Sequence, residues 1–168
     1  ILERIEWSND IASHVGVDID SYNILTMRNL VQLENKTGEQ LKEIKKAVNV
    51  PFVIKGVFTQ EAVDLVKEVK PDVVVVSNHG GRIDTNIGST ADFLAEKGKI
   101  LQENCAELWV DGGIRTFTDL ITAGNLGAKE VLIGRPFVTA LCAGGKGKVL
   151  ELAKSFSMEH NLYQYEPK

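Results

Sequence analysis

The sequence predicts an α/β protein, whose 168 residues form the C-terminal five βα units of an eight-stranded (β/α)8 barrel of the TIM type. Five short apolar segments alternate with amphipathic helical segments, and such alternation is typical of parallel βα units. Each expected strand also ends in a polar residue, namely Asp18, Lys55, His79, Asp111 and Arg135. An open doubly wound sheet gathers its ligand residues at one crevice, whereas a barrel distributes them around the rim formed by its strand ends. The barrel is therefore favoured.

The expected elements follow one another at the spacing of βα units. An amphipathic helix over residues 1–12, a strand over 14–20 and an irregular connector over 21–35 open the chain. Thr37 and Gln40 then have the form of a capping box that starts a helix, and Thr59 is placed to cap the helix over 60–69. Further strands are expected at 51–57, 72–78, 108–111 and 131–134, and further helices at about 90–101, 118–126 and 149–160.

The barrel is expected to be incomplete. Eight βα units need ~250 residues, and the chain opens on Ile1 rather than Met, so we read it as a part of a longer protein. The inner face of the sheet is expected to carry Val53, Val74, Val76 and Val110, which need covering. We therefore expect a homo-oligomer, or completion of the barrel by a missing N-terminal half.

Composition excludes several classes of function. Hydrophobic residues make up 43% and charged residues 25%, with a net charge of −4, which is the range of soluble globular proteins. The absence of a basic patch makes nucleic acid a poor partner, and no apolar run approaches the ~20 residues that span a membrane. Cys105 and Cys142 lie far apart without a CxxC pattern, so we expect reduced thiols in a cytoplasmic protein, with no disulfide and no metal site.

Two neighbouring strand-end loops have the composition of a phosphate site. Asp111, Gly112, Gly113, Ile114 and Arg115 follow one strand, and Gly134, Arg135 and Pro136 follow the next. Glycines let backbone N–H groups approach an anion, and arginines give it bidentate hydrogen bonds. The last two strand-end loops are the usual phosphate site of these barrels. The alternative is a pair of tight turns. Neither GxGxxG nor GxxxxGK[ST] occurs, which disfavours a dinucleotide or Walker-type site, and residues 144–148 are expected to form a turn.

A candidate base follows the valine-rich strand. His79 lies between this strand and a Gly-Gly-Arg loop, and imidazole titrates close enough to neutral pH to take a proton from a hydroxyl group. Arg82, three residues later, is suited to a carboxylate. His14 and His160 lack such surroundings and are given no role.

Four motifs together resemble the FMN-dependent 2-hydroxy-acid oxidases and dehydrogenases, the family of glycolate oxidase, lactate oxidase and mandelate dehydrogenase. They are Pro-Phe-Val-Ile-Lys-Gly at 51–56, Ser-Asn-His-Gly-Gly-Arg at 77–82, Asp-Gly-Gly-Ile-Arg at 111–115 and Ile-Gly-Arg-Pro-Phe at 133–137. They stand in family order and extend the resemblance from about Val15 to the last helix. The resemblance implies that residues 1–168 are the C-terminal part of a flavin-binding barrel domain, that FMN is the cofactor and that a small 2-hydroxy acid is the substrate.

The resemblance also implies individual roles. His79 is the base, Asp18 orients it and stabilises its imidazolium, and Arg82 binds the substrate carboxylate. The alternatives are that Asp20 takes the role of Asp18, or that both acids only cap the loop. The residues implied in cofactor binding are Lys55 beside the flavin ring, Ser77, Asp111 at the ribityl chain, and Gly112, Gly113, Arg115, Gly134 and Arg135 around the phosphate.

Two positions depart from the family pattern, and two other functions remain open. The segment Arg82-Ile83-Asp84 is one residue shorter than the usual Arg-x-Leu-Asp, and Phe117 replaces a common glycine, which affects the choice of substrate more than the binding of flavin. The alternatives are another FMN barrel enzyme, such as type 2 isopentenyl diphosphate isomerase, and a half-barrel that binds phosphate without catalysis.

Overall fold

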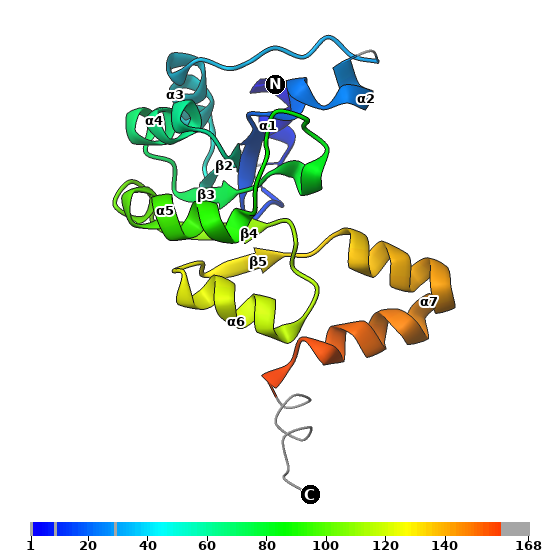
Figure 1. Cartoon of the computed structure of the whole chain (residues 1–168). Coiled ribbons are helices and arrows are strands. Elements are labelled where there is room, and N and C mark those ends of the chain that lie inside the picture. Colours follow the sequence, from blue (N-terminus) through cyan, green and yellow to red (C-terminus); the bar gives the residue numbers. More distant parts are fainter. Residues whose placement is uncertain (1, 9, 29, 159–168) are drawn as a thin grey trace, which may run out of the picture.

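The computed structural model describes residues 2–8, 10–28 and 30–158. Its centre is a five-stranded sheet with strands in the order β1-β2-β3-β4-β5, and each neighbouring pair is parallel (Figure 1). Spatial order equals chain order, so the sheet has no reversal point of the kind that defines an open doubly wound sheet. The predicted succession of barrel units is confirmed. The strands are β1 (Val15–Asp18), β2 (Phe52–Val57), β3 (Val73–Val76), β4 (Glu107–Asp111) and β5 (Glu130–Leu132).

Helices follow the strands, and their first turns are fixed by local hydrogen bonds. The predicted capping box at Thr37 and Gln40 is present, Thr59 accepts a hydrogen bond from Ala62 N, and Thr116 forms a second capping box with Asp119. Such caps satisfy backbone donors that a helix leaves free at its start. The helices are α1 (Leu2–Ser8), η1 (Ser21–Asn23), α2 (Leu25–Arg28), α3 (Gly38–Ala47), α4 (Gln60–Val69), η2 (His79–Gly81), α5 (Thr90–Gln102), α6 (Phe117–Asn125) and α7 (Arg135–Ser155).

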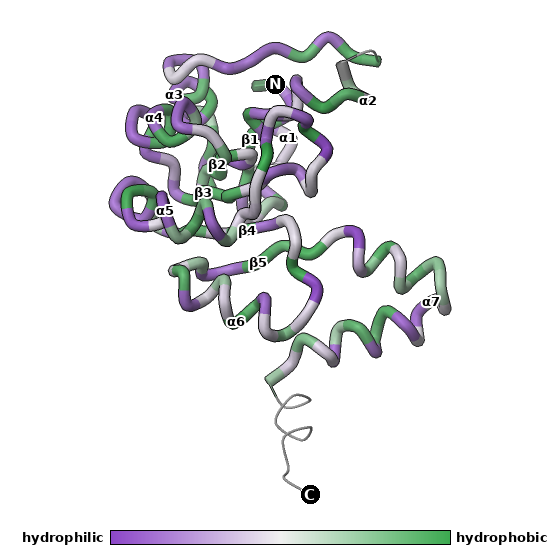
Figure 2. The backbone as a smooth tube through the Cα atoms, viewed as in Figure 1, coloured by the Kyte–Doolittle hydropathy of each residue, from purple (hydrophilic) through white to green (hydrophobic). Residues whose placement is uncertain are grey.

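The two faces of the sheet carry different apolar clusters. The face toward the helices packs strand residues such as Ile54, Val74 and Val110 against helix residues such as Leu41 and Val66. Polar and apolar residues alternate along α3, α4 and α5, as expected of helices that bury one side (Figure 2). The opposite face buries a smaller cluster of Val53, Val73 and Val75 with Trp109 packed against it.

The expected inner face was only partly correct. Val53 does lie on the face away from the helices, but Val74, Val76 and Val110 lie on the helix side, and Val73 and Val75 take their place inside. The reason is the pleat: neighbouring residues of a strand point to opposite faces, and the register pairs Val53 with Val73 and Ile54 with Val74.

Two helical segments differ from the expected boundaries. The first helix ends at Ser8 rather than at residue 12, and the connector contains η1 and α2. The expected turn at residues 144–148 is an interruption within α7, where Gly144 and Gly145 leave helical geometry. Pro136 stands in the first turn of α7, where its fixed φ suits the start of a helix. The end of the expected last helix, residues 159–160, lies outside the described residues.

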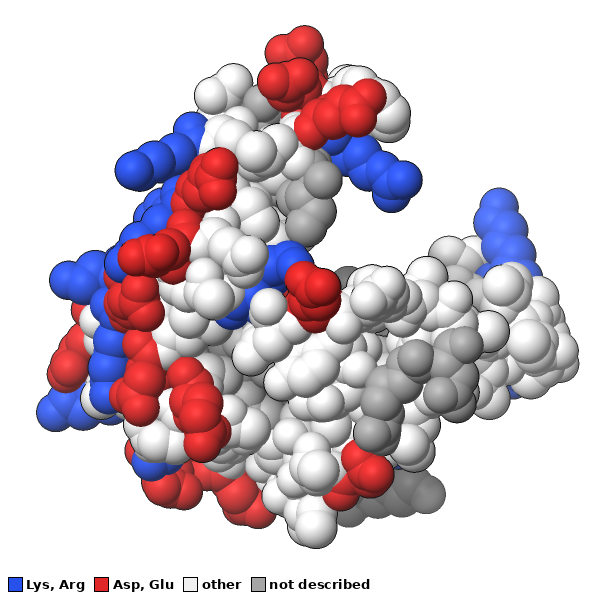
Figure 3. All heavy atoms as spheres, turned by 90° about the horizontal axis from the view of Figure 1, so that it is seen from above, with Lys and Arg blue, Asp and Glu red and all other residues white. Residues whose placement is uncertain are grey.

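The sheet remains open within the described part of the chain. β1 and β5 each have a single neighbouring strand there, and the molecule seen from above is an open crescent (Figure 3). Val138, Leu141 and Leu150 on α7 are exposed apolar residues. Among the described residues, no helix is long and apolar enough to cross a membrane.

Candidate active site

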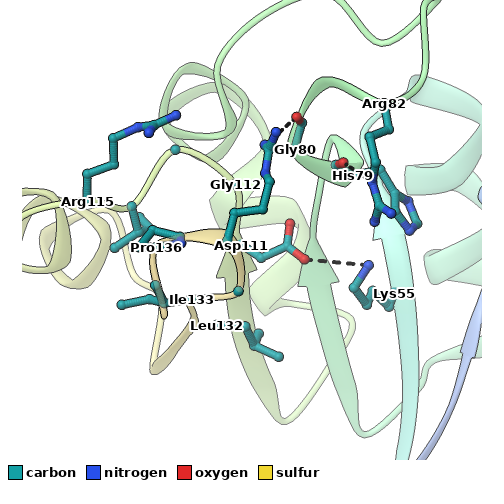
Figure 4. Close-up of a pocket in the computed structure, with 14 residues that line it drawn as sticks. Lys55, His79, Gly80, Arg82, Asp111, Gly112, Arg115, Leu132, Ile133 and Pro136 are labelled. Carbon is teal, nitrogen blue, oxygen red and sulfur yellow. Dashed lines mark hydrogen bonds and ion pairs between the residues drawn. The ribbon is translucent and has the colours of Figure 1, made fainter. Parts of the chain in front are cut away.

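The carboxyl ends of β2 to β5 surround a cavity of about 470 Å³, which is within the usual ~300–1,000 Å³ of small-ligand sites. Nearly all of the predicted site residues contribute to its lining (Figure 4). The two that do not are Asp18 and Ser77, which lie behind Lys55 and His79. The predicted residues in the lining are Lys55, His79, Arg82, Asp111, Gly112, Gly113, Arg115, Gly134 and Arg135.

The glycine loop after β4 has its backbone exposed to the cavity and is held from behind. Gly112 and Gly113 have φ values of 83° and 81°, in the left-handed region that favours glycine. A Cβ atom on Gly113 would meet nothing within 4 Å, whereas one on Gly112 would lie 2.6 Å from Asn78 Oδ1. Thr90 Oγ1 donates a 2.9 Å hydrogen bond to Gly112 O, and Asp119 Oδ2 accepts one of 3.0 Å from Arg115 N. Because Gly113 has no side chain, a ligand in the cavity can approach the backbone of this loop closely.

The loop after β5 continues directly into α7. Gly134 is the N-cap residue and provides no side-chain cap, and a Cβ atom there would meet nothing within 4 Å. The uncapped N–H groups and the partial positive charge of a helix N-terminus favour an anion. This loop and the Gly112–Gly113 loop line the same cavity.

The two predicted phosphate arginines take different positions. The side chain of Arg115 extends from the β4 loop (Figure 4). Arg135 instead donates a hydrogen bond from Nη2 to Gly80 O. Both residues line the cavity. Arg135 therefore links the phosphate loop to the loop that carries His79.

Lys55 lies at the centre of a network of acids on the cavity floor. Its Nζ atom is 3.2 Å from Asp18 Oδ2, 3.5 Å from Asp111 Oδ2 and 3.4 Å from Ser77 Oγ. The ammonium is only partly exposed, with 26% of the side chain accessible. The positive charge of Lys55 is therefore held in place by these oxygen atoms at the wall of the cavity.

The cavity has the donors and acceptors that FMN requires. Asp111 Oδ1 is buried and has no hydrogen-bond partner, which leaves an acceptor for a ribityl hydroxyl group. The glycine loops and arginines provide donors for a terminal phosphate, and Lys55 provides a cation for an anionic flavin ring. The residues of the cavity therefore fit FMN.

His79 is held in an unusual backbone conformation. Its φ is 52°, in the left-handed region that residues other than glycine rarely adopt. Ser77 Oγ accepts a 3.1 Å hydrogen bond from His79 N, and Asn78 Oδ1 accepts one of 3.0 Å from Gly80 N. Local strain of this kind is concentrated at functional sites. Ser77, which is fully buried, thus orients both His79 and Lys55.

Two carboxylates flank the imidazole of His79. Asp18 Oδ2 lies 3.2 Å from Nε2, and Asp20 Oδ1 lies 2.8 Å from Nδ1. Contacts with Asp18 and Asp20 raise the pKa of His79 to about 9. Burial opposes ionisation of Asp18, but contacts with His79, Asp20 and Lys55 outweigh it and lower the pKa of Asp18. Burial and the neighbouring Asp18 raise the pKa of Asp20 to about 6.

The three groups also have the spacing of metal ligands, since their ligand atoms lie within 4.8 Å of one another. The ammonium of Lys55 already contacts Asp18, and His79 contacts both carboxylates. A cation added to this cluster would meet the positive charge of Lys55 at close range. Asp18, Asp20 and His79 therefore form an ion-pair network.

Arg82 is placed to bind an anionic group beside His79. Its Nε atom donates a 3.0 Å hydrogen bond to His79 O, which fixes the start of the guanidinium while the side chain lines the cavity. The terminal nitrogens of a guanidinium are the pair that grips a carboxylate. The turn that carries the base therefore also carries a carboxylate-binding group.

Several supporting residues were not identified from the sequence. Asn78 holds the turn of Gly80, Thr90 holds the Gly112 loop, and Asp119 accepts a hydrogen bond from Arg115 N in the same loop. The Thr116-x-x-Asp119 spacing is a capping signal that was available in the sequence. No local pattern marks Thr90, because its partner Gly112 is 22 residues away in the chain.

The fold and the site define a class: a parallel barrel protein whose strand-end loops combine a phosphate-binding site with a lysine, a histidine and an arginine. The family model of the FMN-dependent dehydrogenases matches residues 9–162. The chain belongs to this FMN-dependent family.

Curated relatives give the same result. The chain is 35% identical over 126 residues to 2-hydroxyacid oxidase of Dictyostelium discoideum, covering 75% of this chain and 32% of the relative. It is 40% identical over 125 residues to L-lactate dehydrogenase (cytochrome) of Saccharomyces cerevisiae, covering 70% of this chain and 21% of the relative. The chain therefore spans a third or less of these two proteins.

Solved structures extend the similarity to nearly the whole chain. A mandelate oxidase variant with (S)-mandelic acid matches with a TM-score of 0.78 and 26% identity, covering 97% of this chain and 54% of that one. A mandelate oxidase variant with a C4a-OH-FMN adduct matches with a TM-score of 0.76 and 28% identity, covering 92% of this chain and 52% of that one. This chain thus corresponds to about half of each of these two chains.

Proposed function

We propose that the protein to which this chain belongs oxidises a small 2-hydroxy acid to the 2-oxo acid with FMN as cofactor. The observation that carries the proposal is that Lys55, His79 and Arg82 line one cavity together with the two glycine-arginine loops. A base, a carboxylate-binding group and a cation for the flavin are the groups that this reaction needs. The names of the relatives, which include 4-hydroxymandelate oxidase of Amycolatopsis orientalis, support the same substrate class.

Each group has a separate task in the proposed reaction. Oxidation of a 2-hydroxy acid releases two electrons and two protons, of which bound FMN takes both electrons and one proton. The neutral form of His79 takes the other proton, and Asp18 and Asp20 stabilise the imidazolium that forms. Because contacts with these carboxylates raise the pKa of His79 to about 9, the fraction of His79 in this neutral form increases as the pH rises toward that value. Arg82 holds the substrate carboxylate next to His79, so that the hydroxyl group lies within reach of the base.

Two features of the candidate active site favour this function over the two alternatives. An isomerase of isopentenyl diphosphate does not require a histidine and an arginine on one turn beside the cavity, as His79 and Arg82 are. A half-barrel without catalysis would not require the network around Lys55.

The test is rapid mixing of the whole FMN-loaded protein with lactate, glycolate or mandelate. His79→Gln is expected to keep its flavin and to reduce it at least ~10²-fold more slowly than wild type, the lower range for loss of a general base. His14→Gln is the matched control, because His14 lies outside the cavity and contacts Trp109. Flavin bleaching at the wild-type rate in His79→Gln would refute the assignment of the base.

A further inference from the structure

We propose that Asn78 is a positioning residue for the candidate active site: its side chain fixes the turn that carries His79 and Arg82 against the glycine loop after β4. Asn78 directly precedes His79 in the chain but does not line the active-site cavity, so it acts through the residues that it holds. Its contacts are independent of the proposed function. Their effect on turnover rests on the proposed function.

The turn that carries the base has a costly backbone conformation. His79, Gly80 and Gly81 follow one another with φ values of 52°, 64° and 76°, all in the left-handed region. Glycine adopts this region freely, but His79 has a Cβ atom and adopts it at a cost. Such a conformation persists only where the surrounding structure fixes it. The groups that fix the backbone of His79 therefore determine where its imidazole points.

Two side chains hold the backbone on the two sides of the His79 Cα atom. Ser77 Oγ accepts a 3.1 Å hydrogen bond from His79 N, and Asn78 Oδ1 accepts one of 3.0 Å from Gly80 N. The two soft torsions of a residue lie between its own N atom and the N atom of the next residue. Anchoring both nitrogens therefore fixes φ and ψ of His79, and Asn78 provides the second anchor.

The amide of Asn78 also contacts the segment that leads into α5. Its Nδ2 atom donates a 3.1 Å hydrogen bond to Gly88 O, and Gly88 directly precedes Ser89, the N-cap residue of this helix. An amide side chain has an acceptor at one end and donors at the other, and both ends are used here. Asn78 therefore joins the His79 turn to the end of the loop over residues 82–88.

A third contact places the turn beside the loop that we assign to the flavin phosphate. A Cβ atom on Gly112 would lie 2.6 Å from Asn78 Oδ1, so the amide occupies the space of the missing side chain. Thr90 Oγ1 donates a 2.9 Å hydrogen bond to Gly112 O and holds the loop in this position. Asn78 thus contacts both the turn of the base and the glycine loop, and it sets their relative position.

The position of Arg82 depends on the same turn. Its Nε atom donates a 3.0 Å hydrogen bond to His79 O, so its guanidinium follows the backbone of His79. Arg135 also binds this turn, at Gly80 O, but a phosphate in the cavity would compete for the donors of Arg135. Asn78 lies outside the lining of that cavity, so a bound flavin leaves its hydrogen bonds intact. Asn78 therefore keeps the base and the carboxylate-binding group in place when the cofactor is bound.

The experiment compares Asn78→Ala, Asn78→Ser and Asn104→Ala with wild type, in the whole FMN-loaded protein. Alanine removes both hydrogen bonds of Asn78, whereas serine keeps an oxygen atom that can accept the bond from Gly80 N. Asn104 is the matched control, because it is also a half-buried asparagine. Its Nδ2 atom donates a 2.8 Å hydrogen bond to Ile100 O, near the opposite end of α5.

The first readout is the hydrogen exchange of the Gly80 amide. In Asn78→Ala we expect this amide to exchange about tenfold faster than in wild type, the factor that corresponds to one lost hydrogen bond. The second readout is the pKa of His79, from NMR titration of its ring. Contacts with Asp18 and Asp20 raise this pKa in wild type, and we expect it to be lower in Asn78→Ala because the ring moves away from them. A loss of overall stability alone would leave the pKa of the folded protein unchanged.

The other two variants give the comparison. We expect Asn78→Ser to keep both readouts close to wild type, and Asn104→Ala to match wild type in both. Wild-type exchange and pKa in Asn78→Ala overturn the proposal. Equal changes in Asn78→Ser and Asn78→Ala also overturn it, because loss of the acceptor oxygen would then not be the cause.

The third readout is the rate of flavin reduction by a 2-hydroxy acid. It should be at least about tenfold lower in Asn78→Ala than in Asn104→Ala, because displaced catalytic groups lose rate steeply. Equal rates in these two variants overturn the positioning role. The first two readouts need no turnover. A wild-type protein whose flavin is reduced by no 2-hydroxy acid therefore refutes the proposed function alone.

Discussion

Arg135, at the start of α7, donates a hydrogen bond to the carbonyl oxygen of Gly80, in the turn that carries His79. The two residues are 55 positions apart in the chain, and the bond connects the loop after β5 to the loop after β3. The guanidinium thereby crosses the cavity in which we place the flavin phosphate. A bound phosphate would compete with Gly80 for the same donors.

Arg135→Ala is expected to weaken FMN binding by about 1.5–3 kcal/mol, or roughly ten- to hundredfold, because one charge-assisted pair is lost. In wild type, Arg135 already donates a hydrogen bond to Gly80 O, and this bond competes with phosphate binding. The expected loss of FMN affinity therefore lies toward the lower end of this range. The measurement is flavin fluorescence quenching on titration of the flavin-free whole protein. Arg4→Ala, on α1 and outside the cavity, is the control. Equal FMN affinity in wild type and Arg135→Ala would exclude Arg135 from the phosphate site.

Gly56→Ala is expected to destabilise the protein by about 1–3 kcal/mol, because a side chain at positive φ is strained and the added methyl group collides with Asp20. Gly124→Ala on α6 is the matched control, since a Cβ atom there meets nothing within 4 Å. In a helix this control should be neutral or slightly stabilising. Denaturant unfolding followed by circular dichroism measures both. Equal stability of the two variants would contradict the proposed crowding at Gly56.

The ion pairs of His79 should make stability depend on pH in the alkaline range. The folded protein raises the pKa of His79 from 6.5 to about 9. Its folded form therefore binds the proton more tightly than its unfolded form. The resulting stabilisation is complete below about pH 6.5 and is lost as the pH rises through about 9.

The measurement compares the free energy of unfolding of wild type and His79→Gln at pH 7 and pH 10. The advantage of wild type should shrink by on the order of 1 kcal/mol over this range, after a discount for screening by water. Acid pH is avoided because the pKa of Asp20, raised to about 6, brings a second titration there. An advantage that is constant from pH 7 to pH 10 would show that folding does not raise the pKa of His79.

The 168-residue chain alone is expected to self-associate and to oxidise 2-hydroxy acids poorly, if at all. β1 and β5 each have one neighbouring strand among the described residues, and unpaired strand edges recruit other chains. Exposed apolar residues on α7, such as Val138 and Leu141, add to this tendency. Light scattering, flavin content and acid oxidation of the isolated chain measure the outcome. A soluble monomer with a normal enzymatic rate would be the opposite result.

The sequence by itself determined the order of the elements and the contents of the strand-end loops. Valine runs, the Thr37 and Thr59 caps and the Gly112–Gly113 turn are local signals, because each depends on residues only a few positions apart. The polar residues at the ends of β2 to β5 met at one cavity, as expected of neighbouring parallel strands. These features could therefore be predicted before any coordinates were known.

Only the tertiary structure decided which groups meet within that cavity and which face each valine occupies. The register of β2 against β3 placed Val74 on the helix side and Val73 inside. The distances from His79 to Asp18 and Asp20 distinguished two carboxylates that lie two residues apart in the chain. The bond from Arg135 to Gly80 has no local signal. Such contacts depend on strand register, twist and loop path, which arise from packing between segments that are distant in the sequence.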